Sequence, residues 1–102
     1  MILTANSQTL DSKLKKYQSK VVVLIFSATW CQPCKKLQKI IKDDISKYFP
    51  HVIFIKIDID ESDDLGYNVK HLPTTIIINQ GKKTSTITGY NPALLIKKLQ
   101  KM

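Results

Sequence analysis

The chain has 102 residues, 43% of them hydrophobic, which suits one domain with a single core over residues 1–102. No apolar run is long enough to cross a bilayer, which excludes a membrane-spanning protein. The net charge is +8 and all sixteen basic residues are lysines. Because these lysines are scattered and not interleaved with aromatic residues, we expect a solvated basic surface and no nucleic-acid partner.

The compartment is predicted from the N-terminus and the cysteines. The first residues lack the basic flank and the extended apolar segment of a signal peptide. The chain has only two cysteines, too few for a secreted scaffold held by disulfides. We therefore expect a cytoplasmic protein, with an organelle or a secretory compartment left open if a signal was removed.

The N-terminal third is expected to form a strand, a helix and a second strand. Residues 2–5 suit a short strand, and Ser7 suits the N-cap of the helix that follows. The apolar residues of this helix recur at i, i+4 and i+7: Leu10, Leu14 and Tyr17. Residues 20–26 are mostly β-branched and apolar, which is typical of a strand covered on both faces.

Two cysteines follow that strand in the segment Trp30-Cys31-Gln32-Pro33-Cys34. Pro33 suits the first turn of a helix, where its missing N–H is no loss. A cysteine at a helix start meets unpaired backbone N–H groups and the positive end of the helix dipole, which favour the nucleophilic thiolate. We therefore expect Cys31 to be the exposed attacking thiol and Cys34 the resolving thiol of a dithiol redox motif.

The helix that begins at this motif should be amphipathic and end at Pro50. Its apolar side is expected to consist of Leu37, Ile40, Ile41, Ile45 and Tyr48. Residues 52–59 alternate as the next strand, and residues 60–64 form an acidic turn. Ser62 is expected to cap a short helix that runs through Val69.

The C-terminal third is expected to form a β-hairpin and a final helix. Residues 75–78 and 82–88 read as strands joined by the turn Gln80-Gly81. Asn91-Pro92 suits the start of the last helix, whose inward residues are Leu95, Ile96 and Leu99. The order β-α-β-α-β-α-β-β-α predicts an α/β fold with a largely parallel sheet, helices on both faces and an antiparallel hairpin.

The sequence resembles the thioredoxin family at positions spread in order over almost the whole chain. The matching residues are Phe26, Ala28, Trp30, Cys31, Pro33, Cys34, Lys35, residues 56–61, Leu72, Pro73, Thr74, Gly81 and Gly89. The resemblance implies the thioredoxin fold, a central mixed five-stranded sheet flanked by four helices. It also implies a cis Leu72–Pro73 peptide bond beside the cysteines. The substrate groove around Cys31 would then be formed by Trp30, Gln32, Pro33, Leu72, Pro73, Gly89 and Tyr90.

The function that the resemblance implies is protein disulfide reduction. The Cys31 thiolate would attack a target disulfide, and Cys34 would resolve the mixed disulfide. The implied partners are disulfide-containing target proteins and a thioredoxin reductase or an equivalent dithiol donor. We expect a monomer with no metal and no cofactor beyond the Cys31–Cys34 disulfide itself.

Two other functions stay open, a binding subunit of a larger complex and an oxidase or isomerase in an oxidising compartment. A zinc site is disfavoured because His51 and His71 do not have the required spacing from the cysteines.

The sequence also departs from the family pattern. Ile25 stands where many members have a buried aspartate credited with taking the Cys34 proton, which predicts a slower resolving step or one served by water. Gln32 replaces the usual glycine between the cysteines.

Overall fold

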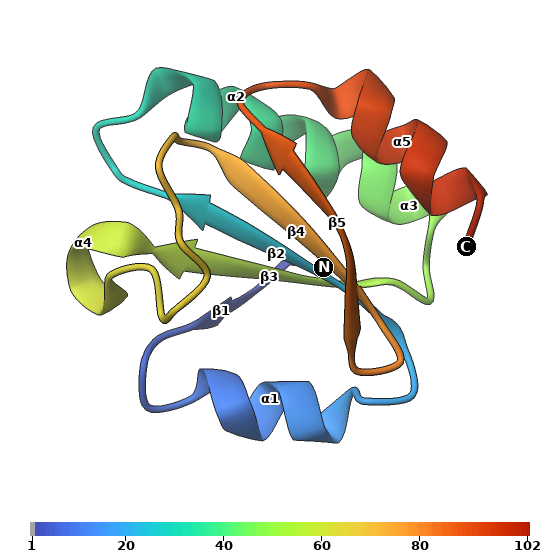
Figure 1. Cartoon of the computed structure of the whole chain (residues 1–102). Helices are drawn as coiled ribbons and strands as arrows, with labels where there is room; N and C mark the ends of the chain where they lie inside the picture. The colour runs from blue at the N-terminus through green and yellow to red at the C-terminus, as the bar shows by residue number, and fades with distance from the viewer. Residues whose placement is uncertain (1) are drawn as a thin grey trace.

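A five-stranded mixed sheet forms the centre of the protein and carries helices on both faces (Figure 1). The computed structural model describes residues 2–102. The strands are β1 (Ile2–Ala5), β2 (Val21–Ser27), β3 (Ile53–Asp58), β4 (Thr74–Asn79) and β5 (Lys82–Thr88). The helices are α1 (Leu10–Lys16), α2 (Gln32–Ile40) with its continuations η1 (Ile41–Ile45) and α3 (Ser46–Tyr48), α4 (Ile59–Ser62) and α5 (Pro92–Gln100). This order confirms the predicted arrangement of five strands and four helices.

The strand order is β1-β3-β2-β4-β5, so β2 lies at the centre of the sheet. Strands β1 and β2 both run parallel to β3, whereas β4 is antiparallel to β2 and to β5. The pairing of β2 with β3 ends at Ser27 and Asp58. Because parallel strands end at the same edge of a sheet, the loop after β2 and the start of α4 are brought together there. This edge carries the cysteines.

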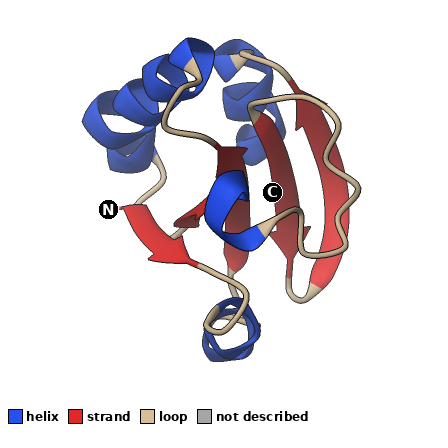
Figure 2. Cartoon of the chain, turned by 90° about the vertical axis from the view of Figure 1, so that its left-hand side faces the viewer, coloured by secondary structure: helices blue, strands red, loops and turns tan. Residues whose placement is uncertain are grey.

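Two apolar layers pack against the two faces of the sheet. In Figure 2 helices lie above and below the strands, and α1 is seen end-on at the bottom. Val23 and Ile25 face the layer that includes the long helix and α5, whereas Leu24 and Phe26 face the layer under α1. All four side chains are fully buried, and burial of each contributes about 1.5–3 kcal/mol. Strand β2 is therefore covered on both faces, as its composition predicts.

The predicted N-cap of the first helix is wrong. Helix α1 begins at Leu10, with Thr9 at the N-cap position and no side-chain cap. The Asn6 side-chain oxygen instead accepts hydrogen bonds from the N–H groups of Gln8 (2.9 Å) and Thr9 (3.1 Å). Asn6 thus forms a turn that satisfies these donors, and Ser7 lies exposed within it.

The expected inward position of Tyr48 is also wrong, because its side chain is 78% exposed. Phe49 packs against the core in its place. The reason is the π-helical segment η1, which takes more residues per turn than an α-helix. The buried positions after Leu37 are Ile41 and Ile45, and the next inward direction falls on the residue after Tyr48.

The expected helix from Ser62 to Val69 does not form. Helix α4 begins earlier, at Ile59, where the Asp58 side chain accepts a hydrogen bond from the Asp60 N–H (2.9 Å) and acts as the N-cap. Ser62 is instead the last residue of α4 and is buried. The following segment cannot continue a right-handed helix because several of its residues have positive φ. These residues are Asp63, Leu65, Gly66 and Asn68.

Candidate active site

Cys31 and Cys34 form a disulfide at the N-terminus of α2, with their Cα atoms 5.3 Å apart. Cys31 has extended backbone angles and occupies the N-cap position, where a serine or aspartate oxygen is more usual. Its sulfur accepts a hydrogen bond from the Cys34 N–H at 3.3 Å. In the reduced protein the same N–H group and the helix dipole would stabilise a thiolate on Cys31.

The two sulfur-bearing residues differ less in exposure than the sequence suggests. Cys34 is fully buried, but Cys31 is only 5% exposed, so the expectation of an exposed attacking residue is wrong for the disulfide form. Ala28, Ile59 and Leu72 pack against the pair and cover most of it. Cys31 nevertheless lines an open hollow of about 730 Å³, whereas Cys34 does not. The two cysteines therefore differ in that only Cys31 faces this hollow.

This hollow, here called the redox groove, is formed by three segments that are distant in the sequence. Its lining residues are Trp30, Cys31, Gln32, Pro33, Ile59, Val69, Lys70, His71 and Leu72. Four of the expected groove residues are therefore present, namely Trp30, Gln32, Pro33 and Leu72. The groove residues that were not expected from the sequence are Ile59 and the three residues before Leu72. The parallel pairing of β2 with β3 is the one signal that could have pointed to Ile59, since it follows β3 directly.

Three other expected groove residues lie outside the lining. Pro73 is buried, and the Leu72–Pro73 peptide bond is cis. The Gly89 N–H donates a hydrogen bond to the Pro73 carbonyl (2.8 Å), which ties the start of β4 to the end of β5. Tyr90 is 42% exposed and does not line the groove. Within residues 2–102 the N–H and carbonyl of Leu72 make no hydrogen bond to the protein.

Trp30 is held at the rim of the redox groove by a hydrogen bond that the sequence did not suggest. Its indole Nε1–H donates to Asp60 Oδ2 at 2.7 Å, although the residue is 67% exposed. Asp60 lies in α4, which starts where β3 ends. In the sequence the acidic turn indicates only a helix start, because Trp30 and Asp60 are too far apart along the chain for a local pattern to show their contact.

Apolar residues pack against the disulfide, namely Ala28, Ile59 and Leu72. Ile25 is fully buried in the central strand. Residues 2–102 contain no group of three histidine, cysteine or acidic side chains that could hold a metal. Over the same residues no helix has the length and apolar character needed to cross a membrane.

Comparison with known proteins identifies the family. The family model described as Thioredoxin matches residues 1–101. Thioredoxin-1 of Saccharomyces cerevisiae is 38% identical over 80 residues, which cover 76% of this chain and 77% of the yeast protein. Thioredoxin-2 of Pyricularia oryzae is 36% identical over 88% of this chain, but the chain spans only 52% of that relative's length.

Solved structures agree with the sequence relatives. The reduced Schistosoma mansoni thioredoxin pre-protein superimposes with a TM-score of 0.88 at 32% identity, covering 98% of this chain and 96% of the other. Thioredoxin from Trypanosoma brucei brucei gives a TM-score of 0.87 at 30% identity, covering 99% and 89%. With the disulfide at the start of α2, these matches show that the chain belongs to the thioredoxin family of thiol–disulfide oxidoreductases.

Proposed function

We propose that the chain reduces disulfide bonds in protein targets, with Cys31 as the attacking thiol and Cys34 as the resolving thiol. The observation that carries this proposal is the unequal placement of the two residues. Cys31 lines the redox groove and accepts the Cys34 N–H, whereas Cys34 is enclosed. A target can therefore form a mixed disulfide only with Cys31. The Cys34 sulfur, one helical turn away, can then attack this mixed disulfide and displace the target.

The reaction transfers two electrons from the chain to the target. The Cys31 thiolate attacks one sulfur of the target disulfide, forms a mixed disulfide and releases the other target sulfur as a thiolate, which takes up a proton. Cys34 then loses its proton and attacks the Cys31 sulfur, which breaks the mixed disulfide. The target leaves with two thiols, and the chain keeps the Cys31–Cys34 disulfide. No cofactor enters these steps, and a dithiol donor such as a thioredoxin reductase restores the reduced chain.

The redox groove is suited to an extended segment of the target. The unpaired N–H and carbonyl of Leu72 can hydrogen-bond to such a segment as a short β-augmentation. The His71 carbonyl accepts from the Thr74 hydroxyl and the Pro73 carbonyl accepts from Gly89, so this stretch is held in place on either side of Leu72. Trp30, Gln32 and Pro33 also line the groove. Tyr90 remains a proposed contact for longer targets.

The resolving step is proposed to be slow compared with family members that carry an aspartate at the position of Ile25. The isoleucine at this position supplies no carboxylate to accept the Cys34 proton. The proton must then leave to water or to the departing target thiolate. Only the rate of the resolving step is affected, because the displacement itself needs only the two sulfurs.

We also propose that the chain acts as a monomer in the cytoplasm. The apolar residues of both sheet faces are covered within one chain, so folding requires no second copy. The compartment rests on the small number of cysteines and on the reducing direction proposed for the reaction.

Reduction of insulin disulfides with dithiothreitol as donor tests the proposal. The wild type should accelerate reduction, Cys31→Ser should fall to the rate without protein, and Lys97→Gln on the exposed side of α5 serves as a matched control. Inert wild-type protein would instead indicate a binding subunit. A redox titration of the cysteine pair gives its reduction potential. A value of about −270 mV is expected for a reductant, and a value of about −120 mV would indicate an oxidant.

A further inference from the structure

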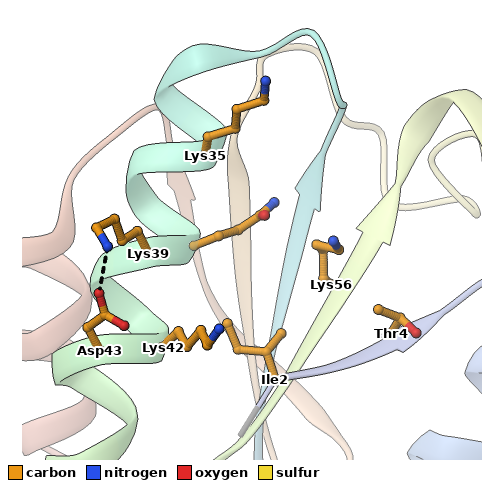
Figure 3. Close-up of a pocket in the computed structure, with 8 residues that line it drawn as sticks. Ile2, Thr4, Lys35, Lys39, Lys42, Asp43 and Lys56 are labelled. Atoms are coloured by element: carbon orange, nitrogen blue, oxygen red, sulfur yellow. Dashed lines mark ion pairs between the residues drawn. The ribbon is translucent and has the colours of Figure 1, made fainter.

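A second hollow lies beside the long helix (Figure 3). Its volume is about 590 Å³, and it lies between α2–η1 and the strands β1 and β3. Its lining residues are Ile2, Thr4, Lys35, Gln38, Lys39, Lys42, Asp43 and Lys56. We call this feature the lysine hollow. Neither cysteine lines it, and the thiol–disulfide reaction uses none of these residues.

The lysine hollow contains four ammonium groups and one carboxylate. The carboxylate of Asp43 lies 3.1 Å from Lys39 Nζ, and both side chains are largely exposed, at 48% and 80%. Such an exposed pair along a helix contributes little to stability and is easily exchanged for other partners. No other ion pair occurs within residues 2–102, so Lys35, Lys42 and Lys56 have no carboxylate within 4.0 Å. The local charge is therefore strongly positive.

Lys56 is the least expected of these residues, because it lies in the middle of β3 and is half-buried. Its neighbours in the sheet are Thr4 on β1 and Ile25 on β2, and neither carries a charge. Asp58, two residues further on the same face, uses its carboxylate to cap α4. The Lys56 ammonium therefore has no carboxylate beside it, and an anion from solution that enters the hollow can serve as its counter-charge.

The arrangement of the cations indicates what kind of anion fits. Figure 3 shows Lys42 extending from the helix and Lys56 standing on the strand across the hollow, with Ile2 and Thr4 on the β1 side. Cations from two elements on opposite sides suit a compact group with several charged oxygens. Lysine binds phosphate as a point charge, and the Thr4 hydroxyl can donate one further hydrogen bond. The volume lies in the range of small-molecule sites.

We infer that the lysine hollow binds a compact oxyanion with more than one negative charge, namely a phosphate or the phosphoryl group of a small molecule. Lys42 and Lys56 are the principal ligands, and Thr4 and Gln38 supply neutral polar groups. Lys35 lies at the end nearest the disulfide and adds long-range attraction. An extended acidic peptide is the less suitable occupant, because the charges enclose a hollow between two elements and do not follow a continuous line.

Titration of the ¹⁵N-labelled protein with inorganic phosphate, pyrophosphate and glycerol phosphate tests this inference at constant ionic strength, balanced with sodium chloride. We expect saturable shifts of the backbone amides of Thr4, Lys42 and Lys56. Lys42→Gln/Lys56→Gln should weaken pyrophosphate binding at least about tenfold, given the strength of charge-assisted hydrogen bonds. The control Lys82→Gln/Lys83→Gln removes the same charge from β5, at the opposite edge of the sheet, and should change affinity less than about twofold.

Three outcomes would overturn the inference. Chemical shifts that do not saturate, or that change equally at lysines outside the hollow, would show non-specific attraction of the anion to a basic protein. Equal losses in the two double variants would show the same. Tighter binding of a hexaglutamate peptide than of pyrophosphate at the same amides would assign the hollow to a protein partner. If the double variant is poorly folded, Lys42→Gln alone suffices, because this residue is exposed and its loss should still weaken binding.

Discussion

The redox groove and the lysine hollow both use α2, but their polar groups are satisfied in different ways. In the redox groove the Cys34 N–H is bonded to the Cys31 sulfur, and the Trp30 indole is bonded to Asp60. In the lysine hollow Lys56 is half-buried without a charged partner. The comparison shows that one site is ordered by bonds within the chain before any reactant arrives. The other retains lysines without a carboxylate partner, which leaves them available to an anion from solution.

The largest expected effect comes from separating the roles of the two cysteines. Cys34→Ser removes the resolving sulfur but leaves Cys31 at the N-cap, so turnover should stop and a mixed disulfide with the target should accumulate. Cys31→Ser should also stop turnover but give no adduct, because Cys34 is enclosed. Non-reducing electrophoresis and intact mass measure the adduct. Equal adduct formation by both variants would contradict the unequal access on which the proposed function rests.

The next effect concerns the apolar surroundings of Cys34. Ile25→Asp places a carboxyl group in the central strand and should speed decay of the mixed disulfide by acting as a base. The control Ile25→Asn buries a similar polar group that cannot act as a base, and it should leave the decay rate near that of the wild type. Stopped-flow measurement of target release gives the rates. A wild-type rate in Ile25→Asp would mean that proton removal does not limit resolution.

Both Ile25 variants should also unfold more easily. Each replaces a fully buried apolar side chain with a polar one, which costs about 2–5 kcal/mol of unfolding free energy. Urea denaturation measures the loss. A change below about 0.5 kcal/mol would show that the central strand tolerates polar groups better than its burial implies.

A smaller effect is expected at the rim of the redox groove. Asp60→Ala removes the acceptor of the Trp30 indole hydrogen bond, whose net contribution is about 0.5–1.5 kcal/mol. We expect a KM for protein targets that is raised a few-fold with little change in kcat, since the ring becomes less ordered while the sulfurs are untouched. Asp60→Asn keeps an acceptor oxygen and should restore the wild-type KM. The indole N–H resonance reports the bond directly, and an unchanged resonance in Asp60→Ala would refute it.

The smallest effect is expected at the one ion pair beside the lysine hollow. Asp43→Asn removes the partner of Lys39 and should change the unfolding free energy by less than about 0.5 kcal/mol, because both groups are exposed. It should strengthen pyrophosphate binding slightly, since it removes the only carboxylate of the hollow. Weaker pyrophosphate binding in this variant would contradict the charge argument made for the hollow.

Comparison of prediction with structure shows where local information is sufficient. The order of elements, the doubly covered central strand and the helix start at Cys31 follow from neighbouring residues, and each is confirmed. The errors in local structure concern Ser7, Tyr48 and Ser62. At each of these positions the local signal was genuine, but another interaction replaced it: the Asn6 turn, the π-helical segment, and the Asp58 cap.

The sequence by itself determined the chemistry of this protein. The two cysteines, their spacing and the proline between them are local features, and their meaning depends on one helix turn alone. Only the tertiary structure decided which residues surround that chemistry. Strand pairing and helix packing determine the burial of Cys31, the contact of Trp30 with Asp60 and the addition of Ile59 and His71 to the redox groove. They also bring Lys42 and Lys56 to the lining of one hollow. Such contacts join residues far apart in the chain, where no short-range pattern records them.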